Sequence, residues 1–313
     1  MAKYTDQDIK MAFDNAGLAD YVQGNPNEII KNVLYQSQSF DIIRVVEGIK
    51  RDEKVLDILP GTTTLAKGSV SEIAVSGDTS LKDVDVHVEL IGLREDYSPH
   101  KLIGKIPGLL LGDGSAPDDA ALTDMVMELK GSEVVKQVEQ AIWLGNSALD
   151  VTGIVPEASA AGDVKKTGSA PVVLTAANAM TVVNSVKDKY YSEFPNYMHE
   201  EAAMFMSPEN FATWYEAKFG LAGLVNGDSL NTQELPKKVR IPGTNITIHS
   251  ILGMAGNNNI VLTRAANFII GTDLEDDFVE FKYMDANYKY QLAMNFKLGT
   301  KIARTNEVVI TKA

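Results

Sequence analysis

The sequence contains no cysteine among its 313 residues, which excludes disulfide bonds, thiolate catalysis and cysteine-ligated metal centres. It also has no apolar run near the roughly 18 residues that a membrane-spanning helix requires. The first residues, MAKYTDQD, lack the apolar core of a secretory signal. These absences predict a protein without a membrane partner, and they agree with a reducing compartment.

A positive net charge is also missing. The formal net charge is −13 at pH 7, whereas a dedicated nucleic-acid-binding surface needs clustered Lys and Arg. The longest basic cluster is interleaved with Glu47, Asp52 and Glu53, and we interpret it as a charged helix face. Its members are Arg44, Lys50, Arg51 and Lys54. We therefore expect at most weak contact with nucleic acid, without sequence specificity.

Convergent catalytic or metal-binding groups are absent as well. The four histidines, His87, His100, His199 and His249, lie in four different predicted elements. HEEAA at 199–203 lacks the second His of a zinc-protease helix. GNSAL at 145–149 ends in Leu where a nucleophile elbow needs Gly, and it follows a helix rather than a strand. The acidic residues of 273–280 lack EF-hand spacing and predict a solvated turn. We predict no enzyme: no catalytic residue, no cofactor and no metal site, with His87 simply solvated.

What the sequence does contain is one long predicted hairpin at 62–93, which would not be stable alone. A Thr/Val/Ile-rich run at 62–75 is followed by turn residues at 76–79 and by a strictly alternating return strand. The apolar face of that strand, the hairpin stripe, consists of Val84, Val86, Val88 and Leu90. Arms of roughly 13 residues would reach about 40 Å. The stripe must rest on the chain's own body or on a neighbouring copy, and the length of the arms favours the neighbour.

Other segments predict an α+β protein of ordinary globular composition, with 45% hydrophobic and 23% charged residues. Helices are predicted at 5–22, 28–56, 118–145, 176–191 and 208–219. Strands are predicted at 202–206, 239–241, 246–251, 260–262, 268–270, 278–284, 288–298 and 307–311. Trp143 and Trp214 lie on apolar helix faces and are expected to anchor the core.

Three stretches, in this order and spacing, resemble the major capsid proteins of tailed bacteriophages, which share the Hong Kong 97-like fold. Glu133 to Asn146 (EVVKQVEQAIWLGN) resembles the end of that family's spine helix. Ala203 to Gly220 (AMFMSPENFATWYEAKFG) is similar to the buried strand and capped helix of the axial domain. Asn259 to Asp276 (NIVLTRAANFIIGTDLED) resembles the run into the long strands of the peripheral domain.

The resemblance implies a Hong Kong 97-like capsid fold with an N-terminal arm, an extended β-hairpin loop, a long spine helix, a peripheral-domain sheet and an α/β axial domain. The expected boundaries are 1–57 for the arm, 58–100 for the extended loop, 101–155 for the peripheral domain with its spine helix, 156–261 for the axial domain, and 262–313 for the return strands of the peripheral domain.

The function that the resemblance implies is that of a major capsid protein, which assembles into an icosahedral shell of pentamers and hexamers around a phage double-stranded DNA genome. The expected location is the virion capsid, assembled in the host cytoplasm. The expected partners are other copies of the chain, the packaged DNA through weak non-specific contacts, and portal and scaffolding or decoration proteins.

The resemblance also implies roles for three groups of residues. The hairpin stripe would contact a neighbouring subunit, the four basic residues would face inward, and the loop carrying Gly223, Asn226 and Gly227 would lie near the ring axis. An encapsulin-like nanocompartment shell around a cargo enzyme is the alternative within this fold. The segment 5–22 leaves that alternative open, because encapsulin-like chains usually begin with a helix. A soluble α/β enzyme is a third class, which the lack of convergent catalytic groups disfavours.

Overall fold

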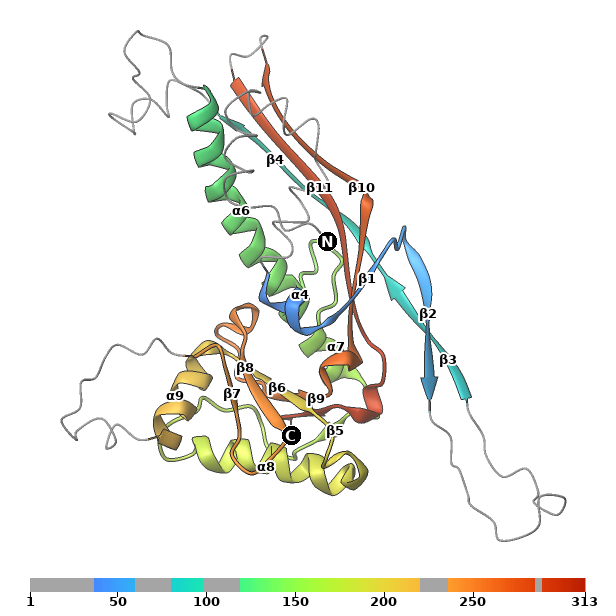
Figure 1. Cartoon of the computed structure of the whole chain (residues 1–313), viewed down its shortest axis with the longest axis vertical. Coiled ribbons are helices and arrows are strands. Elements are labelled where there is room, and N and C mark those ends of the chain that lie inside the picture. The colour runs from blue at the N-terminus through green and yellow to red at the C-terminus, as the bar shows by residue number, and fades with distance from the viewer. Residues whose placement is uncertain (1–36, 60–79, 98–118, 220–235, 285–288, 313) are drawn as a thin grey trace, which may run out of the picture.

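The long helix α6 (Asp119–Leu144) runs along one sheet and meets a second lobe at its C-terminal end, and a two-stranded hairpin projects from the molecule (Figure 1). The computed structural model describes residues 37–59, 80–97, 119–219, 236–284 and 289–312. Among these residues, no helix is long and apolar enough to cross a membrane.

A four-stranded sheet, the long sheet, lies beside α6. Its order is β1 (Arg44–Glu47), β10 (Phe268–Met284), β11 (Lys289–Ile302) and β4 (Glu89–Tyr97). β1 is parallel to β10, and the other neighbours are antiparallel. Alternate residues of β11 are buried in one core with Val134 and Val138 of α6. They are Leu292, Met294, Phe296 and Leu298. The period of two in β11 therefore matches an apolar stripe of the helix.

The helix α6 ends where the sequence places a glycine. Gly145 has a positive φ of 75°, and its amide donates to the carbonyl of Ala141 (3.0 Å). A Cβ at Gly145 would lie 2.1 Å from the carbonyl oxygen of Thr152, so only glycine fits this close approach. The predicted spine helix and its end at Gly145 are confirmed.

The second lobe is built on a six-stranded sheet, the lobe sheet, of order β5-β12-β9-β6-β8-β7. Its strands are β5 (Lys165–Lys166), β12 (Val309–Ile310), β9 (Val261–Thr263), β6 (Ala202–Met206), β8 (Ile246–Ser250) and β7 (Lys238–Arg240). All five residues of β6 are buried, as expected for a central strand. α8 (Ala179–Glu193) and α9 (Pro208–Phe219) contribute Tyr190, Phe211 and Trp214 to the core of this lobe. The predicted strand 202–206 and helix 208–219 are confirmed.

Short elements connect these parts. The helices are α4 (Gln38–Ile42) and α7 (Ile154–Ala160), and the 3-10 helices are η1 (Pro195–Tyr197), η3 (Leu252–Met254), η4 (Ala265–Asn267) and η5 (Thr305–Glu307). Trp143 near the end of α6 is fully buried, with its ring 4.8 Å from that of Phe205 in β6 and 5.9 Å from that of Phe268 in β10. Trp143 therefore joins the spine helix, the lobe sheet and the long sheet in one core, as its prediction as an anchor requires.

The projecting hairpin consists of β2 (Asp52–Leu59) and β3 (Ser80–His87), paired antiparallel from Asp52↔His87 to Leu59↔Ser80. The partner of β3 is therefore 52–59 and not the predicted first strand at 62–75, which lies outside the described part of the chain. The predicted helix at 28–56 is wrong from Ile43 onward, since β1 and β2 occupy that segment.

Two further expectations differ from the structure. The acidic segment 273–280 is not a solvated turn but part of β10, where Asp273 is fully buried beside Lys297 (2.6 Å). The expected boundaries also cut across the sheets. β1, assigned to the arm, and β4, assigned to the extended loop, both belong to the long sheet, while β12 at the C-terminal end belongs to the lobe sheet.

Candidate functional site

The base of the hairpin is held by a small apolar cluster, the hairpin-base cluster. Its buried members are Ile49, Val55, Val84, Val86, Val88, Ile269 and Ala303. They come from the hairpin and the residues next to it, from β10 and from the segment just after β11. Val86 is completely buried and Val88 is 2% exposed. Burying a valine side chain stabilises a fold by about 1.5–3 kcal/mol, so this cluster fixes the direction in which the hairpin leaves the body.

Two glycines opposite each other in the long sheet make this contact close. Gly271 of β10 pairs with Gly299 of β11. A Cβ at Gly271 would lie 2.8 Å from Cγ1 of Val88, and a Cβ at Gly299 would lie 1.9 Å from the carbonyl oxygen of His87. The hairpin therefore crosses the long sheet at a point without side chains, where its backbone can approach that of β11.

The prediction that the hairpin stripe rests on a neighbouring copy is wrong for its three valines. Val84, Val86 and Val88 are at most 4% exposed and pack on the chain's own β10 and its surroundings. Leu90, the fourth member, is 62% exposed. A contact between Leu90 and a neighbouring subunit stays a prediction.

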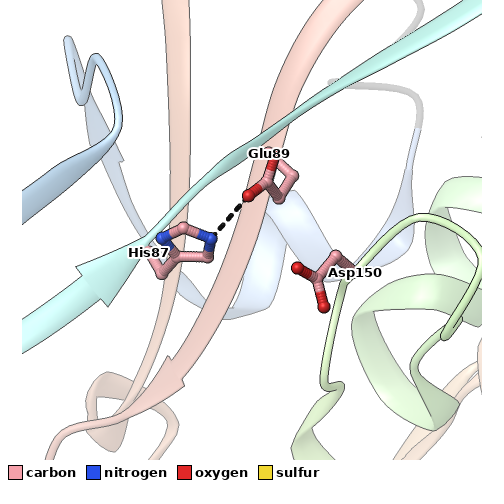
Figure 2. A group of neighbouring side chains, drawn as sticks. All are labelled: His87, Glu89 and Asp150. Carbon is pink, nitrogen blue, oxygen red and sulfur yellow. Dashed lines mark hydrogen bonds and ion pairs between the residues drawn. The ribbon is translucent and has the colours of Figure 1, made fainter.

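The opposite, polar face of the hairpin base carries a group of converging side chains. This group, the acid–imidazole cluster, consists of Asp52, His87, Glu89 and Asp150. Nδ1 of His87 lies 2.5 Å from Oδ1 of Asp52, and Nε2 lies 2.7 Å from Oε1 of Glu89. These hydrogen bonds, the one to Asp52 above all, raise the pKa of His87 above its ordinary value. Figure 2 shows the Asp150 carboxylate reaching toward His87 and Glu89 from a separate loop. His87 is exposed on the polar face, as the sequence predicts, but it is paired with two carboxylates that the sequence analysis did not identify.

A tight loop after α6 presents Asp150 to this cluster. The amide of Asn146 donates to the carbonyl of Val151 (2.8 Å), and the amide of Val151 donates back to Asn146 (3.2 Å). Asp150 has a φ of 55°, a conformation that Asp tolerates better than most residues. Nothing in the local sequence indicates that this turn meets β3, because the contact depends on the path of the whole chain.

The four basic residues lie on two strands and on the segment between them, and not on the helix face that the sequence suggests. Arg44 begins β1, Lys54 lies in β2, and Lys50 and Arg51 lie between these strands. The intervening Ile49 donates its amide to the carbonyl of Thr272 (3.2 Å), which places the segment against β10. All four side chains are exposed, so they are available to a partner. Their orientation toward the interior of a shell stays a prediction.

A buried carboxylate that the sequence analysis did not single out fixes the beginning of the described chain to the spine helix. Glu139 of α6 is 2% exposed. Its Oε1 accepts from Ser37 Oγ (2.6 Å) and from the amide of Ser39 (2.6 Å), and its Oε2 accepts from Ser39 Oγ (2.7 Å). Trp143 Nε1 in turn donates to Ser39 Oγ (2.7 Å). A Glu on the core face of an amphipathic helix was the available signal for such a site.

The remaining predicted site residues, Gly223, Asn226 and Gly227 of the ring-axis loop, lie outside the described residues. Where the structure describes side chains, the acid–imidazole cluster is the group of His and carboxylates whose geometry could hold a metal ion. A His–Asp pair could also act as a general base, but such a role requires a substrate site.

No protein-family model and no curated protein sequence matches the chain. Solved structures do match it over most of its length. A chain of the satellite phage P4 procapsid is 9% identical, with 98% of both chains covered and a TM-score of 0.59. The capsid of a native GTA particle is 14% identical, covering 87% of this chain and 88% of the other, with a TM-score of 0.54. A virus-like particle from Pyrococcus furiosus is 11% identical, covering 91% and 96%, with a TM-score of 0.51.

At these identities the similarity establishes the fold and does not establish the activity. It extends through both lobes and the hairpin, because the matched regions include nearly the whole of each chain. The mixed sheets, the spine helix and the projecting hairpin agree with the arrangement that the sequence resemblance implies. The chain has the Hong Kong 97-like fold of phage capsid proteins.

Proposed function

We propose that this chain is the major capsid protein of a tailed bacteriophage, which assembles into an icosahedral shell of pentamers and hexamers around a double-stranded DNA genome. The observation that carries the proposal is the match to a chain of the phage P4 procapsid over 98% of both chains. A match of that extent leaves little of the chain for an added catalytic domain. The role is accordingly structural rather than enzymatic.

The form of the hairpin supports an assembly role. β2 and β3 project beyond the rest of the described chain in Figure 1. Their apolar face is already used at the base, so contacts with a neighbour would fall on the charged face and on Leu90. Asp83 and Asp85 of β3 are exposed, and Lys54 lies 3.6 Å from Asp83. Such a charged surface favours an interface of specific ion pairs over a second hydrophobic core.

The charge distribution supports weak contact with the enclosed DNA. Duplex DNA carries one negative charge per roughly 1.7 Å, and a strongly basic lining would bind it tightly. The net charge of −13 avoids this, and the exposed Arg44, Lys50, Arg51 and Lys54 are the residues proposed to face inward. The other proposed partners are neighbouring copies of the chain and portal and scaffolding or decoration proteins. The proposed location is the virion capsid, assembled in the host cytoplasm.

A second candidate is an encapsulin-like shell that encloses a cargo enzyme. The similarity to the Pyrococcus furiosus virus-like particle, over 91% of this chain, supports this second candidate. Nuclease-protected DNA in particles purified from cells would support the phage capsid, and a stoichiometric protein cargo without DNA would support the compartment.

The proposal is tested by electron microscopy and light scattering of the purified protein. Closed particles with five-fold and six-fold rings are expected, and a well-behaved monomer under all assembly conditions would contradict the proposal. An insertion at Asn226–Gly227 should leave the subunit folded and change ring formation. Charge reversal of the four basic residues should change DNA retention but leave the shells closed.

A further inference from the structure

Three side chains of the acid–imidazole cluster that could hold an ion come from separate elements. His87 ends β3, Glu89 begins β4, and Asp150 belongs to the loop after α6. One ligand atom from each lies within 4.8 Å of the other two. Around a tetrahedral ion with bonds of about 2.0–2.2 Å, ligand atoms lie roughly 3.5 Å apart. His87 and Asp150 are exposed, so their side chains have room to adjust to that spacing around an ion.

The orientation of the imidazole suits a metal ligand. Nδ1 of His87 faces Asp52 at 2.5 Å, and this contact leaves Nε2 directed toward Glu89. Metal-binding histidines commonly donate the other ring N–H to a carboxylate, which fixes the tautomer and the ring orientation. Asp52 supplies that carboxylate here. The hydrogen bond between Nε2 and Glu89 would be replaced by two bonds to the same ion.

A cavity of about 120 Å³ adjoins the cluster and is lined by His87, Asp150 and Thr300, among others. Thr300 is 8% exposed, and its buried Oγ1 has no hydrogen-bond partner among the described residues. The same cavity contains Lys301, but its ammonium group is paired with Glu157 at 2.8 Å. The carboxylates of Asp52, Asp85, Glu89 and Asp150 lie at the cluster or line the cavity, and they favour a cation.

We propose that His87, Glu89 and Asp150 bind one divalent transition-metal ion, with Zn²⁺ as the best fit to one imidazole and two carboxylates. Water would complete the coordination, and Asp52 would orient His87 without touching the ion. Mixed nitrogen and oxygen ligands favour Zn²⁺ over Mg²⁺, which prefers oxygen ligands in octahedral geometry. The bound ion would tie the hairpin base to the loop after the spine helix. This inference concerns the folded subunit and does not depend on the proposed function.

Isothermal titration calorimetry of the metal-free protein with ZnCl₂ tests the site. One Zn²⁺ per chain is expected, with no comparable binding of Mg²⁺. His87→Gln should abolish binding, and Asp150→Asn should weaken it at least about 10-fold. Asp52→Asn should weaken it by roughly 10–100-fold, as is typical for a group that orients a ligand. The matched controls, His199→Gln and Asp188→Asn, replace exposed residues of the lobe and should bind like the wild type.

Hydrogen exchange provides a second measurement that does not depend on affinity alone. Zn²⁺ should slow exchange in 80–97 and in 145–153, and Asp150→Asn should remove the effect in both segments. Asp150 lies outside the hairpin. If metal-free Asp150→Asn and the metal-free wild type show the same exchange pattern, the fold of the variant is intact. Absence of stoichiometric Zn²⁺ binding to the wild type, or equal binding by His87→Gln, would overturn the proposal.

Discussion

The hairpin base and the lobe bury apolar side chains in different ways. In the lobe, β6 has a neighbouring strand on both sides and packs with α8 and α9, which lie just before and just after it in the chain, so Met204, Phe211 and Trp214 share one core. At the hairpin base, one face of two strands meets the long sheet over a few valines at a pair of glycines. The lobe can lose one contact and keep the others, whereas the described part of the hairpin packs on the body through one small apolar cluster.

This difference explains how a projecting hairpin can hold a defined direction. A two-stranded sheet is marginally stable in water, so β2 and β3 rely on the residues at which they leave the body. Gly271 and Gly299 allow the backbone of the hairpin to touch β11, and the valines fill the space that remains. Changes at this point should therefore alter the hairpin first and the lobe little.

The largest effect is expected from charges within the hairpin-base cluster. The double variant Val86→Asp with Val88→Asp removes two buried side chains and places two carboxylates in an apolar contact. We expect the free energy of unfolding of the isolated subunit to fall by at least about 4 kcal/mol. Denaturant unfolding of the subunit measures this loss.

Val173→Asp is the control for this double variant, because Val173 lies in the lobe region and is 64% exposed. It should change stability by less than about 0.5 kcal/mol. If the double variant instead kept the stability of the wild-type subunit and failed only in shell assembly, the valines would be contacting a neighbour after all.

A smaller effect is expected from one methyl group at the glycine crossing. Gly299→Ala would place a Cβ 1.9 Å from the carbonyl oxygen of His87, so one of the two backbones must move. Such overpacking costs about 1–3 kcal/mol. Hydrogen exchange should show the loss in 80–97, with protection of β6 and β8 unchanged.

Gly162→Ala provides the comparison, since a Cβ at Gly162 would meet nothing within 4 Å. Its stability should stay close to that of the wild type. Equal exchange in 80–97 for both alanine variants would mean that the crossing is not the point that holds the hairpin.

The lobe and the hairpin also differ in how much of their structure could be predicted from the sequence. In the lobe, Ser207 and Pro208 begin α9, with Ser207 Oγ accepting from the amide of Asn210 (3.4 Å), and this local signal located the helix correctly. At the hairpin, the apolar spacing of 44–56 fits a helix as well as a strand. The pairing of β1 with Ile269–Thr272 decides for the strand, and no local pattern contains that information.

The candidate site shows the same limit of local reasoning. His87 alternates correctly onto the polar face of β3, but its partner Asp150 comes from a loop that only the complete fold brings near. The period of two identified the hairpin stripe in the sequence. It could not identify β10 as the surface on which the valines pack, because β10 is distant in sequence. Gly271 and Gly299 gave no signal, since two glycines in separate strands predict nothing until the strands are paired.

A further expected effect is a dependence of lobe stability on pH. His249 of β8 lies 9% exposed against the ring of Phe205, at a centroid distance of 5.5 Å. Burial, helped by the charge of Lys238, lowers the pKa of His249 to about 4. In the unfolded chain the same group binds a proton near pH 6.5. Between these values the unfolded state binds more protons, so the unfolding free energy of the subunit should fall as the pH is lowered from about 6.5 toward 4.

His249→Gln removes this titration, and its unfolding free energy should therefore decrease less steeply over that pH range than that of the wild type. Denaturant unfolding at pH 7, 6 and 5 measures the slope, and His199→Gln, which replaces an exposed histidine of the same lobe, should keep the wild-type slope. Parallel slopes for His249→Gln and the wild type would show that His249 takes up its proton over the same pH range in the folded lobe as in the unfolded chain. In that case its contact with Phe205 would have to accommodate a charge, and the lobe core would be less apolar around β8 than its burial indicates.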